Sequence, residues 1–303
     1  MSDHVNKPGR RIRPVLAVCA AAVALAAAAL TGWLVWAAPD GSANHRPGAG
    51  APPSAPAAGP AAGASASTAA PGTPQASGPA PLAGKVVVID PGHNPGNFAH
   101  SREINAKVDV GTHRKECDTT GTAAGSGYTE AAFTLDVSHR LRELLEERGA
   151  TVVLTHDADR PYGPCIDERA RIGNEARADA AVSVHADGSA AGHRGHHVIL
   201  PALVKAGSAD TAPIVGPSRT LGERIAAEFA RATGSSPANY LGGGTGLDVR
   251  KDLGGLNLST VPKVFVECGN MRDPDDAASL EDPAWRQKAA HGIADGITTY
   301  LLG

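Results

Sequence analysis

The feature that most constrains the fold is an alternation of two residue patterns between residues 84 and 303. Short runs of apolar, mostly β-branched residues, such as 85–90 and 151–155, are typical of strands buried on both faces. Between them, stretches such as 129–148 carry apolar residues at helical spacing. Strands that alternate with helices predict a single α/β domain with a mostly parallel, doubly wound sheet flanked by helices.

The same patterns predict further elements in this part of the chain. We expect additional strands at 180–184, 196–200 and 262–268, and additional helices at 166–178, 218–233 and 282–301. Two of these helices have a recognisable start: Ser218 is a capping residue type, and Asp282 is followed by Pro283 at the first helical position.

The beginning of the chain has a different composition. A basic segment, 1–14, precedes an uncharged run, 15–36, which is long enough to cross a bilayer core of about 30 Å as a helix. The basic flank predicts that 1–14 stays in the cytoplasm and that the rest of the chain is exported, with 15–36 as a transmembrane anchor. The alternative is a cleaved signal sequence, which also places the rest outside the cytoplasm.

Residues 37–83 consist almost entirely of Ala, Pro, Gly and Ser. Such a stretch cannot bury enough apolar surface to offset the entropy of ordering it, so we expect a disordered linker. Its prolines make it extended, which suits a domain that works on a wall or matrix at some distance from a membrane.

Charge and aromatic content exclude one class of partner. The net charge is −3 and aromatic residues make up 4% of the chain. The chain therefore lacks the basic surface and the stacking platforms that nucleic-acid binding uses, and we expect no nucleic-acid partner. We expect a monomer.

Residues with metal-binding side chains stand at the predicted carboxyl ends of strands. His93 and His185 each follow such a run, and Glu267 ends another. Glu130 begins the first long helix. Proteins with parallel sheets bind small molecules at the edge formed by the carboxyl ends of the strands. Two imidazoles with one carboxylate are the protein ligands of a catalytic zinc site. A second glutamate beside it could transfer protons during amide hydrolysis.

Each of these residues also has a simpler explanation. A histidine at a strand end is often a packing or hydrogen-bonding residue. Glu130 is in the first turn of a helix, where a negative side chain interacts favourably with the helix dipole. Glu267 is harder to explain in this way, because a carboxylate at the end of an apolar strand needs a partner.

The motifs around these residues resemble the zinc-dependent N-acetylmuramoyl-L-alanine amidases of bacterial cell walls, particularly the actinobacterial and mycobacterial forms. The resemblance includes DPGH at 90–93, AAVSVHA at 180–186 and VPKVFVECGNM at 261–271, and it extends over residues 85–302. It implies hydrolysis of the amide between N-acetylmuramic acid and L-alanine, with peptidoglycan or its muropeptides as the substrate.

The resemblance also assigns roles to the four residues. It implies that His93, Glu130 and His185 hold one zinc ion and that Glu267 is catalytic. Two other functions stay open: a different zinc amide hydrolase of the cell wall, such as a peptidase or deacetylase, and a non-catalytic wall-binding module.

Some positions depart from the family pattern. Asp187 replaces an asparagine of many members, and His156 replaces an arginine. The loop 94–128 is longer than in many members and could partly cover the site.

The cysteines fit an exported domain. We predict a disulfide between Cys117 and Cys165, with two free thiols as the alternative. Cys268 is expected to be buried on the face of its strand opposite Glu267.

Three histidines close together in the sequence have more than one possible role. His193, His196 and His197 could form a second metal site, but His196 and His197 must point to opposite faces of a strand, so we expect substrate contacts or surface histidines.

The charged group Arg250, Lys251 and Asp252 could meet carboxylates of a stem peptide or form a solvated loop. Arg169 and Asn174 match the family's helix pattern, and we expect a structural role for both.

Overall fold

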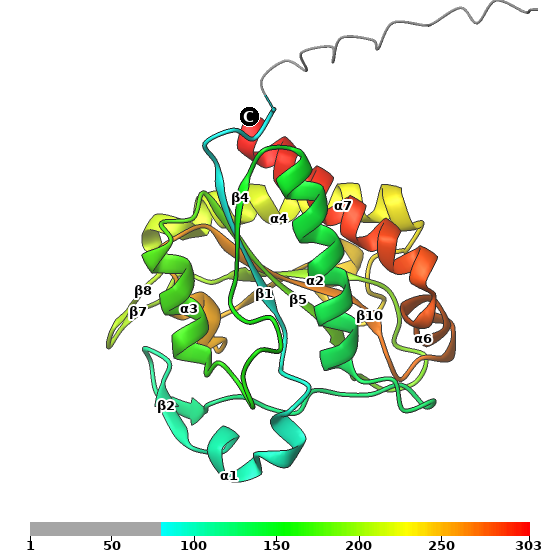
Figure 1. Cartoon of the computed structure of the whole chain (residues 1–303), viewed down its shortest axis with the longest axis horizontal. Coiled ribbons are helices and arrows are strands. Elements are labelled where there is room, and N and C mark those ends of the chain that lie inside the picture. Colours follow the sequence, from blue (N-terminus) through cyan, green and yellow to red (C-terminus); the bar gives the residue numbers. More distant parts are fainter. Residues whose placement is uncertain (1–79) are drawn as a thin grey trace, which may run out of the picture. The chain divides into compact units, whose positions relative to one another are not determined.

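The computed structural model describes residues 80–303, and its centre is a six-stranded sheet (Figure 1). Across the sheet the strands are β4 (Thr151–Leu154), β1 (Val86–Pro91), β5 (Ala180–Asp187), β10 (Lys263–Asn270), β6 (His197–Pro201) and β9 (Leu247–Arg250). The first four are parallel, whereas β6 runs antiparallel to β10 and β9 runs parallel to β6. The prediction of a mostly parallel sheet is confirmed.

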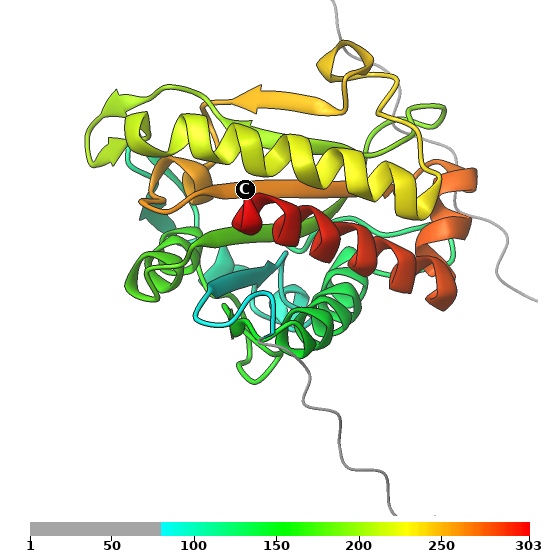
Figure 2. The same ribbon diagram turned by 90° about the horizontal axis from the view of Figure 1, so that it is seen from above.

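Helices cover both faces of this sheet. One face packs against α2 (Glu130–Glu147), α4 (Ala212–Thr233) and α7 (Pro283–Leu302), and Figure 2 shows α4 and α7 side by side. The opposite face carries α3 (Ile166–Glu175) and α5 (Gly254–Asn257), which contact each other. We call these the apolar face and the polar face of the sheet, for the side chains described below.

Shorter elements connect these layers. In chain order they are η1 (Asn97–Ala99), α1 (Ser101–Ile104), β2 (Lys107–Asp109), β3 (Arg114–Glu116), β7 (Lys205–Ala206), β8 (Ala209–Asp210), η2 (Gly242–Gly244) and α6 (Pro274–Glu281). Strands β2 and β3 pair as a small antiparallel sheet inside the long loop 94–128. None of the helices within residues 80–303 has the length and apolar character needed to span a membrane.

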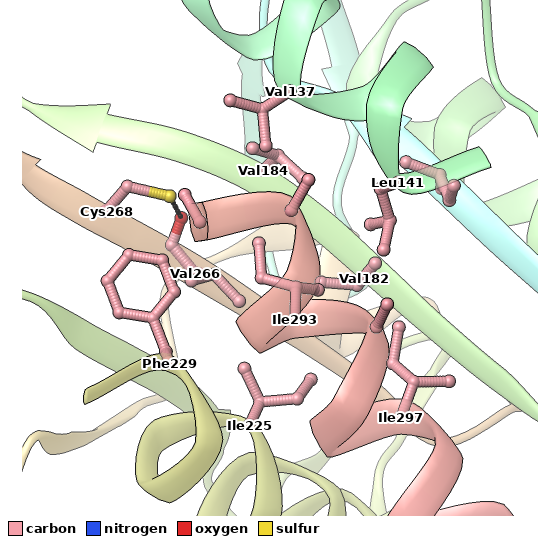
Figure 3. Packing of buried hydrophobic residues seen from close by; sticks show 14 of the residues in the cluster. Val137, Leu141, Val182, Val184, Ile225, Phe229, Val266, Cys268, Ile293 and Ile297 are labelled. Atoms are coloured by element: carbon pink, nitrogen blue, oxygen red, sulfur yellow. Dashed lines mark hydrogen bonds between the residues drawn. The ribbon is translucent and has the colours of Figure 1, made fainter. Parts of the chain in front are cut away.

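The main hydrophobic core lies on the apolar face (Figure 3). Alternate residues of β5, including Val182 and Val184, point toward this core, where they meet side chains of α2 and α7 such as Leu141 and Ile293. Cys268 of β10 is also part of it and is a free, buried thiol, as predicted.

Two of the long helices begin at residues whose side chains cap them. The Thr129 side chain accepts a hydrogen bond from the Ala132 amide at the start of α2. The Asp282 side chain accepts one from the Ala284 amide at the start of α7, where Pro283 occupies the first helical position as predicted.

Two predictions about secondary structure are wrong in detail. The run 151–155 was expected to be buried, but β4 is an edge strand whose residues are exposed or partly exposed. The helix predicted at 218–233 begins earlier, at Ala212, so Ser218 is not its cap but a buried residue inside α4. Pro217 lies inside this helix, where it lacks the backbone donor that would otherwise bond to the carbonyl of Pro213.

The cysteine prediction is confirmed: Cys117 and Cys165 form a disulfide. The predicted segments 1–14 and 15–36 lie outside the described residues, as does most of the predicted linker 37–83. At the end of that linker, Leu82 is fully buried in the core and its amide donates to the Arg148 carbonyl (2.8 Å). The packed part of the chain therefore includes residues just before 84.

Candidate metal centre

Two histidines and one glutamate from three elements meet at one edge of the sheet. His93 follows β1 by two residues, His185 belongs to β5, and Glu130 is the first residue of α2. Their potential ligand atoms all lie within 4.8 Å of one another. Within residues 80–303, this is the only cluster of three or more His, Cys, Asp or Glu side chains that could hold a metal ion.

Glu130 lies between the two imidazoles. Its Oε2 is 3.1 Å from Nε2 of His93, and its Oε1 is 2.9 Å from Nδ1 of His185. The backbone amides of Thr122 and Ala186 also donate to this carboxylate (2.9 and 3.3 Å). Burial raises the pKa of Glu130, but the two histidines outweigh burial and hold that pKa well below its ordinary value. The site therefore contains an ionised carboxylate.

Two glycines allow these side chains to approach one another. A Cβ atom on Gly92 would lie 2.4 Å from the His185 ring. Gly121 has a φ of 74°, and a Cβ atom there would lie 2.8 Å from Oε2 of Glu130. Any larger residue at either position would displace a member of the cluster.

The surroundings of His93 favour its protonated form when no metal is bound. Burial lowers the pKa of His93, but the neighbouring carboxylates of Glu130 and Asp118 outweigh it and raise that pKa to about 10. A metal ion that binds at neutral pH must displace this proton, so metal binding at the cluster is coupled to proton release.

Glu267 lies beside the cluster on β10, directly opposite His185 in the parallel pairing of β10 with β5. Both residues line an open cleft of about 220 Å³. The Oε2 atom of Glu267 is buried and has no hydrogen-bond partner within residues 80–303. Burial, together with the carboxylates of Glu130 and Asp187, raises the pKa of Glu267 well above its ordinary value. A cation bound at the cluster would lower the pKa of Glu267.

The donor set of the cluster fits zinc. Zinc is bound in proteins by imidazole nitrogens, thiolates and carboxylates, whereas calcium and magnesium take oxygen ligands. His93 and His185 each turn one ring nitrogen toward Glu130, and the ring of His185 is stacked on Phe265 (ring centroids 5.2 Å apart).

Of the charged residues Arg250, Lys251 and Asp252 at the end of β9, only Arg250 lines the cleft. Arg250 lines the cleft together with Glu267, and its guanidinium pairs with Asp252 (2.6 Å). Lys251 is exposed.

The predicted histidine group is divided. His193 is exposed and its ring is stacked on Tyr240 (4.7 Å), but His196 and His197 are buried, so the expectation of surface histidines is wrong for these two. They do point to opposite faces, because His196 contacts Phe229 of α4 whereas His197 meets Tyr240 edge-on.

The two departures from the family pattern have local partners. Asp187 accepts a hydrogen bond from the Tyr240 hydroxyl (2.7 Å), and His156 is buried with Nε2 3.0 Å from the Pro91 carbonyl. The long loop 94–128 does approach the cluster: Lys115 and Thr119 line a pocket of about 170 Å³ that also includes His93 and His185.

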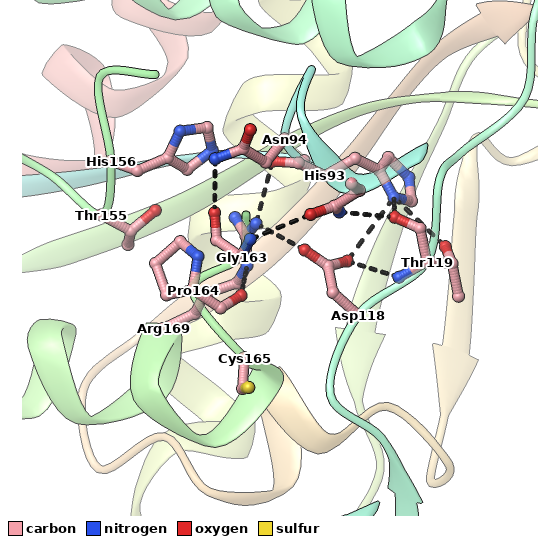
Figure 4. Close-up of polar contacts among 12 residues, drawn as sticks. His93, Asn94, Asp118, Thr119, Thr155, His156, Gly163, Pro164, Cys165 and Arg169 are labelled. Atoms are coloured by element: carbon pink, nitrogen blue, oxygen red, sulfur yellow. Dashed lines mark hydrogen bonds and ion pairs between the residues drawn. The ribbon is translucent and has the colours of Figure 1, made fainter. Parts of the chain in front are cut away.

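Asp90, Asp118 and Lys263 are buried charged residues that the sequence patterns did not reveal, whereas Arg169 has the structural role expected for it. Asp90 accepts hydrogen bonds from Lys263 (3.1 Å) and Arg169 (2.8 Å), and Arg169 also contacts Asp118 (2.9 Å), as Figure 4 shows in part. A lysine within the apolar run 262–268 was a usable signal, because a buried ammonium requires a partner. Asn174 is structural as expected, with its side chain bonded to backbone groups of Leu258 and Thr260.

Comparisons with known proteins agree on one family. The family model described as N-acetylmuramoyl-L-alanine amidase matches residues 87–299. The N-acetylmuramoyl-L-alanine amidase Rv3717 of Mycobacterium tuberculosis is 42% identical over 224 residues, which cover 74% of this chain and 89% of the relative.

Solved structures show the same likeness. The N-acetylmuramyl-L-alanine amidase Ami1 from Mycobacterium smegmatis matches with a TM-score of 0.67 and 39% identity, covering 73% of this chain and 98% of the other. The apo form of Ami1 from Mycobacterium abscessus matches with a TM-score of 0.66 and 40% identity, covering 73% and 100% of the two chains.

Proposed function

The chain belongs to the N-acetylmuramoyl-L-alanine amidase family, and we propose that it acts on bacterial peptidoglycan as a zinc enzyme. It hydrolyses the amide between the lactyl group of N-acetylmuramic acid and the L-alanine that begins the stem peptide. The observation that carries the proposal is the approach of two imidazoles and one carboxylate within 4.8 Å, with a second carboxylate beside them in the same cleft.

Three residues hold the metal in this proposal: His93, Glu130 and His185. Their ring nitrogens and carboxylate already face one another, and Gly92 and Gly121 leave room for that approach. A zinc ion held by these residues would supply a water of lowered pKa, about 7, and a Lewis acid for the carbonyl of the scissile amide.

Glu267 transfers the proton. Its carboxylate accepts a proton from the attacking water and donates it to the alanine nitrogen as the amide bond breaks. The buried, unpartnered Oε2 beside the cluster supports this role, and burial raises the pKa of Glu267 in the direction that favours proton uptake.

The test is product analysis of muropeptides digested by the full chain. Mass spectrometry should find free stem peptides that begin with an L-alanine amino group, and EDTA should abolish their release until zinc is restored. Cleavage within the stem peptide, or loss of acetyl groups from the sugar, would identify a peptidase or a deacetylase instead.

Two variants test the assigned roles. His93→Ala should lose zinc and activity together, whereas Glu267→Gln should keep zinc and lose about 10²–10⁴-fold in kcat. His291→Ala and Glu175→Gln alter exposed residues of the same types and serve as matched controls. Full zinc content in His93→Ala, or wild-type turnover in Glu267→Gln, would remove that residue from its role.

We also propose where the enzyme works. Family membership and the disulfide both fit action outside the cytoplasm at the cell wall. Residues 15–36 would deliver it as an anchor or cleaved signal, and the part of 37–83 that precedes the packed residues around Leu82 would serve as the linker. We propose a monomer, because one chain supplies all four site residues.

A further inference from the structure

His93 has an unusual backbone conformation. Its φ of 63° lies in the left-handed region, which non-glycine residues rarely adopt and which persists only where the surroundings enforce it. The enforcing group is Arg169 of α3. Its guanidinium donates to the carbonyls of His93 (2.9 Å) and Pro91 (2.6 Å), so it holds the backbone on both sides of Gly92.

Arg169 is itself held by a buried carboxylate close to the same histidine. Its side chain is only 7% exposed, and its Nη2 lies 2.9 Å from Oδ2 of Asp118, whose side chain is 8% exposed. Figure 4 shows Arg169, Asp118 and His93 linked by one set of contacts. A planar guanidinium can bind several acceptors in fixed directions, so its position determines theirs.

The second oxygen of Asp118 faces the ring of His93. Oδ1 lies 3.6 Å from Nδ1 of His93, an ion-pair rather than a hydrogen-bond distance, and the carbonyl and hydroxyl oxygens of Thr119 lie 3.1 and 3.2 Å from the same nitrogen. The Asp118 carboxylate and the Thr119 carbonyl can only accept, so they favour the tautomer with the proton on Nδ1. In the neutral imidazole that a metal ion requires, the lone pair is then on the other nitrogen, Nε2, which faces Glu130.

A covalent bond ties the two segments that carry these groups. Asp118 directly follows Cys117, and the backbone amide of Arg169 donates to the carbonyl of Cys165 (3.0 Å). Cys117 and Cys165 form the disulfide, so the carboxylate and the guanidinium are anchored at one cross-link.

From these contacts we infer that Asp118 is a positioning residue of the metal centre: together with Arg169 it fixes the tautomer and orientation of His93 so that Nε2 is presented to zinc. The inference rests on the proposed zinc site. Outer carboxylates of this kind typically contribute 10–100-fold to metal affinity.

The experiment compares zinc affinity in two variants of the full chain. Asp118→Asn should weaken zinc binding by about 10–100-fold, measured by competition with a chromophoric chelator. The matched control is Asp157→Asn, which alters an exposed carboxylate paired with His139 outside the site and should leave zinc affinity close to wild type. The visible spectrum of the cobalt-substituted enzyme should change in Asp118→Asn.

A measurement on the wild type covers the case in which Asp118→Asn does not fold. Long-range ¹H–¹⁵N NMR of the zinc-loaded enzyme should show His93 protonated at Nδ1 and metal-bound through Nε2. Coordination through Nδ1 would overturn the inference, as would wild-type zinc affinity and an unchanged cobalt spectrum in Asp118→Asn. If His93→Ala also bound zinc normally, the proposed zinc site itself would fail, which separates the two failures.

Discussion

The two faces of the central sheet use the same strands but are stabilised in different ways. Toward α2, α4 and α7, alternate residues of β5 and β10 are apolar and fully buried: Ala180, Val182, Val184, Val264 and Val266. On the opposite face, the residues between them include polar and ionisable groups: Ser183, His185, Lys263 and Glu267.

The two faces differ in whether the interactions that stabilise them depend on direction. Apolar burial is non-directional and grows with the area removed from water, so many packings can supply it. On the polar face, each buried charge needs a partner at a particular place, and the Asp90 carboxylate has four: Lys263, Arg169, Ser183 and Thr155. The candidate metal centre lies at the end of this ordered face, where fixed directions are required.

The largest stability change is expected from Lys263→Met on the polar face. The ammonium of Lys263 and the Asp90 carboxylate are both 3% exposed and lie 3.1 Å apart. Removing one partner leaves a buried charge short of its counter-ion, which should lower the free energy of unfolding by about 3–5 kcal/mol in urea denaturation.

An exposed pair provides the control. Lys85 and Asp179 lie 3.5 Å apart with side chains 38% and 35% exposed, so Lys85→Met should cost less than about 1 kcal/mol. Equal losses in the two variants would show that burial of the pair does not matter, and the contrast between the faces would lose its basis.

A cavity in the apolar face should have a similar or smaller effect, and of a different kind. Leu141 is fully buried in the main core, and Leu141→Ala should cost about 2–5 kcal/mol of unfolding free energy. Because Leu141 lies about three turns along α2 from Glu130, the folded variant should bind zinc as tightly as the wild type in chelator competition. A weakened zinc affinity would mean that the two faces are coupled.

The apolar face is the part of the fold that could be predicted from the sequence. Periodicity alone places β1, β5, β10, α2 and α7, because each buries a stripe or a run of apolar residues. Periodicity does not show where a strand lies in the sheet or which way it runs. It therefore did not distinguish the edge strand β4 from a buried one, and it did not show that β6 runs antiparallel to β10.

The polar face was predicted only at its end. His93, His185 and Glu267 are recognisable because strand ends and a family resemblance identify them. Asp90 and Lys263 are separated by 173 residues, and the sequence around either residue does not show that the other is its partner. Asp118 lies in a long loop without periodicity, so only the three-dimensional contacts connect it to His93.

The smallest expected effect, and the one that discriminates best between the faces, is the response to acid. Burial raises the pKa of Asp90, but Lys263 and Arg169 outweigh it and hold that pKa well below its ordinary value of 3.8. A carboxyl with a lowered folded-state pKa stabilises the fold fully above its ordinary pKa, and this stabilisation declines as the pH falls toward the folded-state value.

Below about pH 4, protonation of Asp90 should therefore reduce the free energy of unfolding by up to about 1.4 kcal/mol for each pH unit. The measurement is urea denaturation of the full chain at a series of pH values. Leu141→Ala should be less stable at every pH but keep the wild-type slope, because its lost contacts carry no charge. Lys263→Met should have a shallower slope, since the Asp90 carboxyl loses a cation that lowers its pKa. Parallel curves for all three proteins would show that the charges of the polar face do not control its stability.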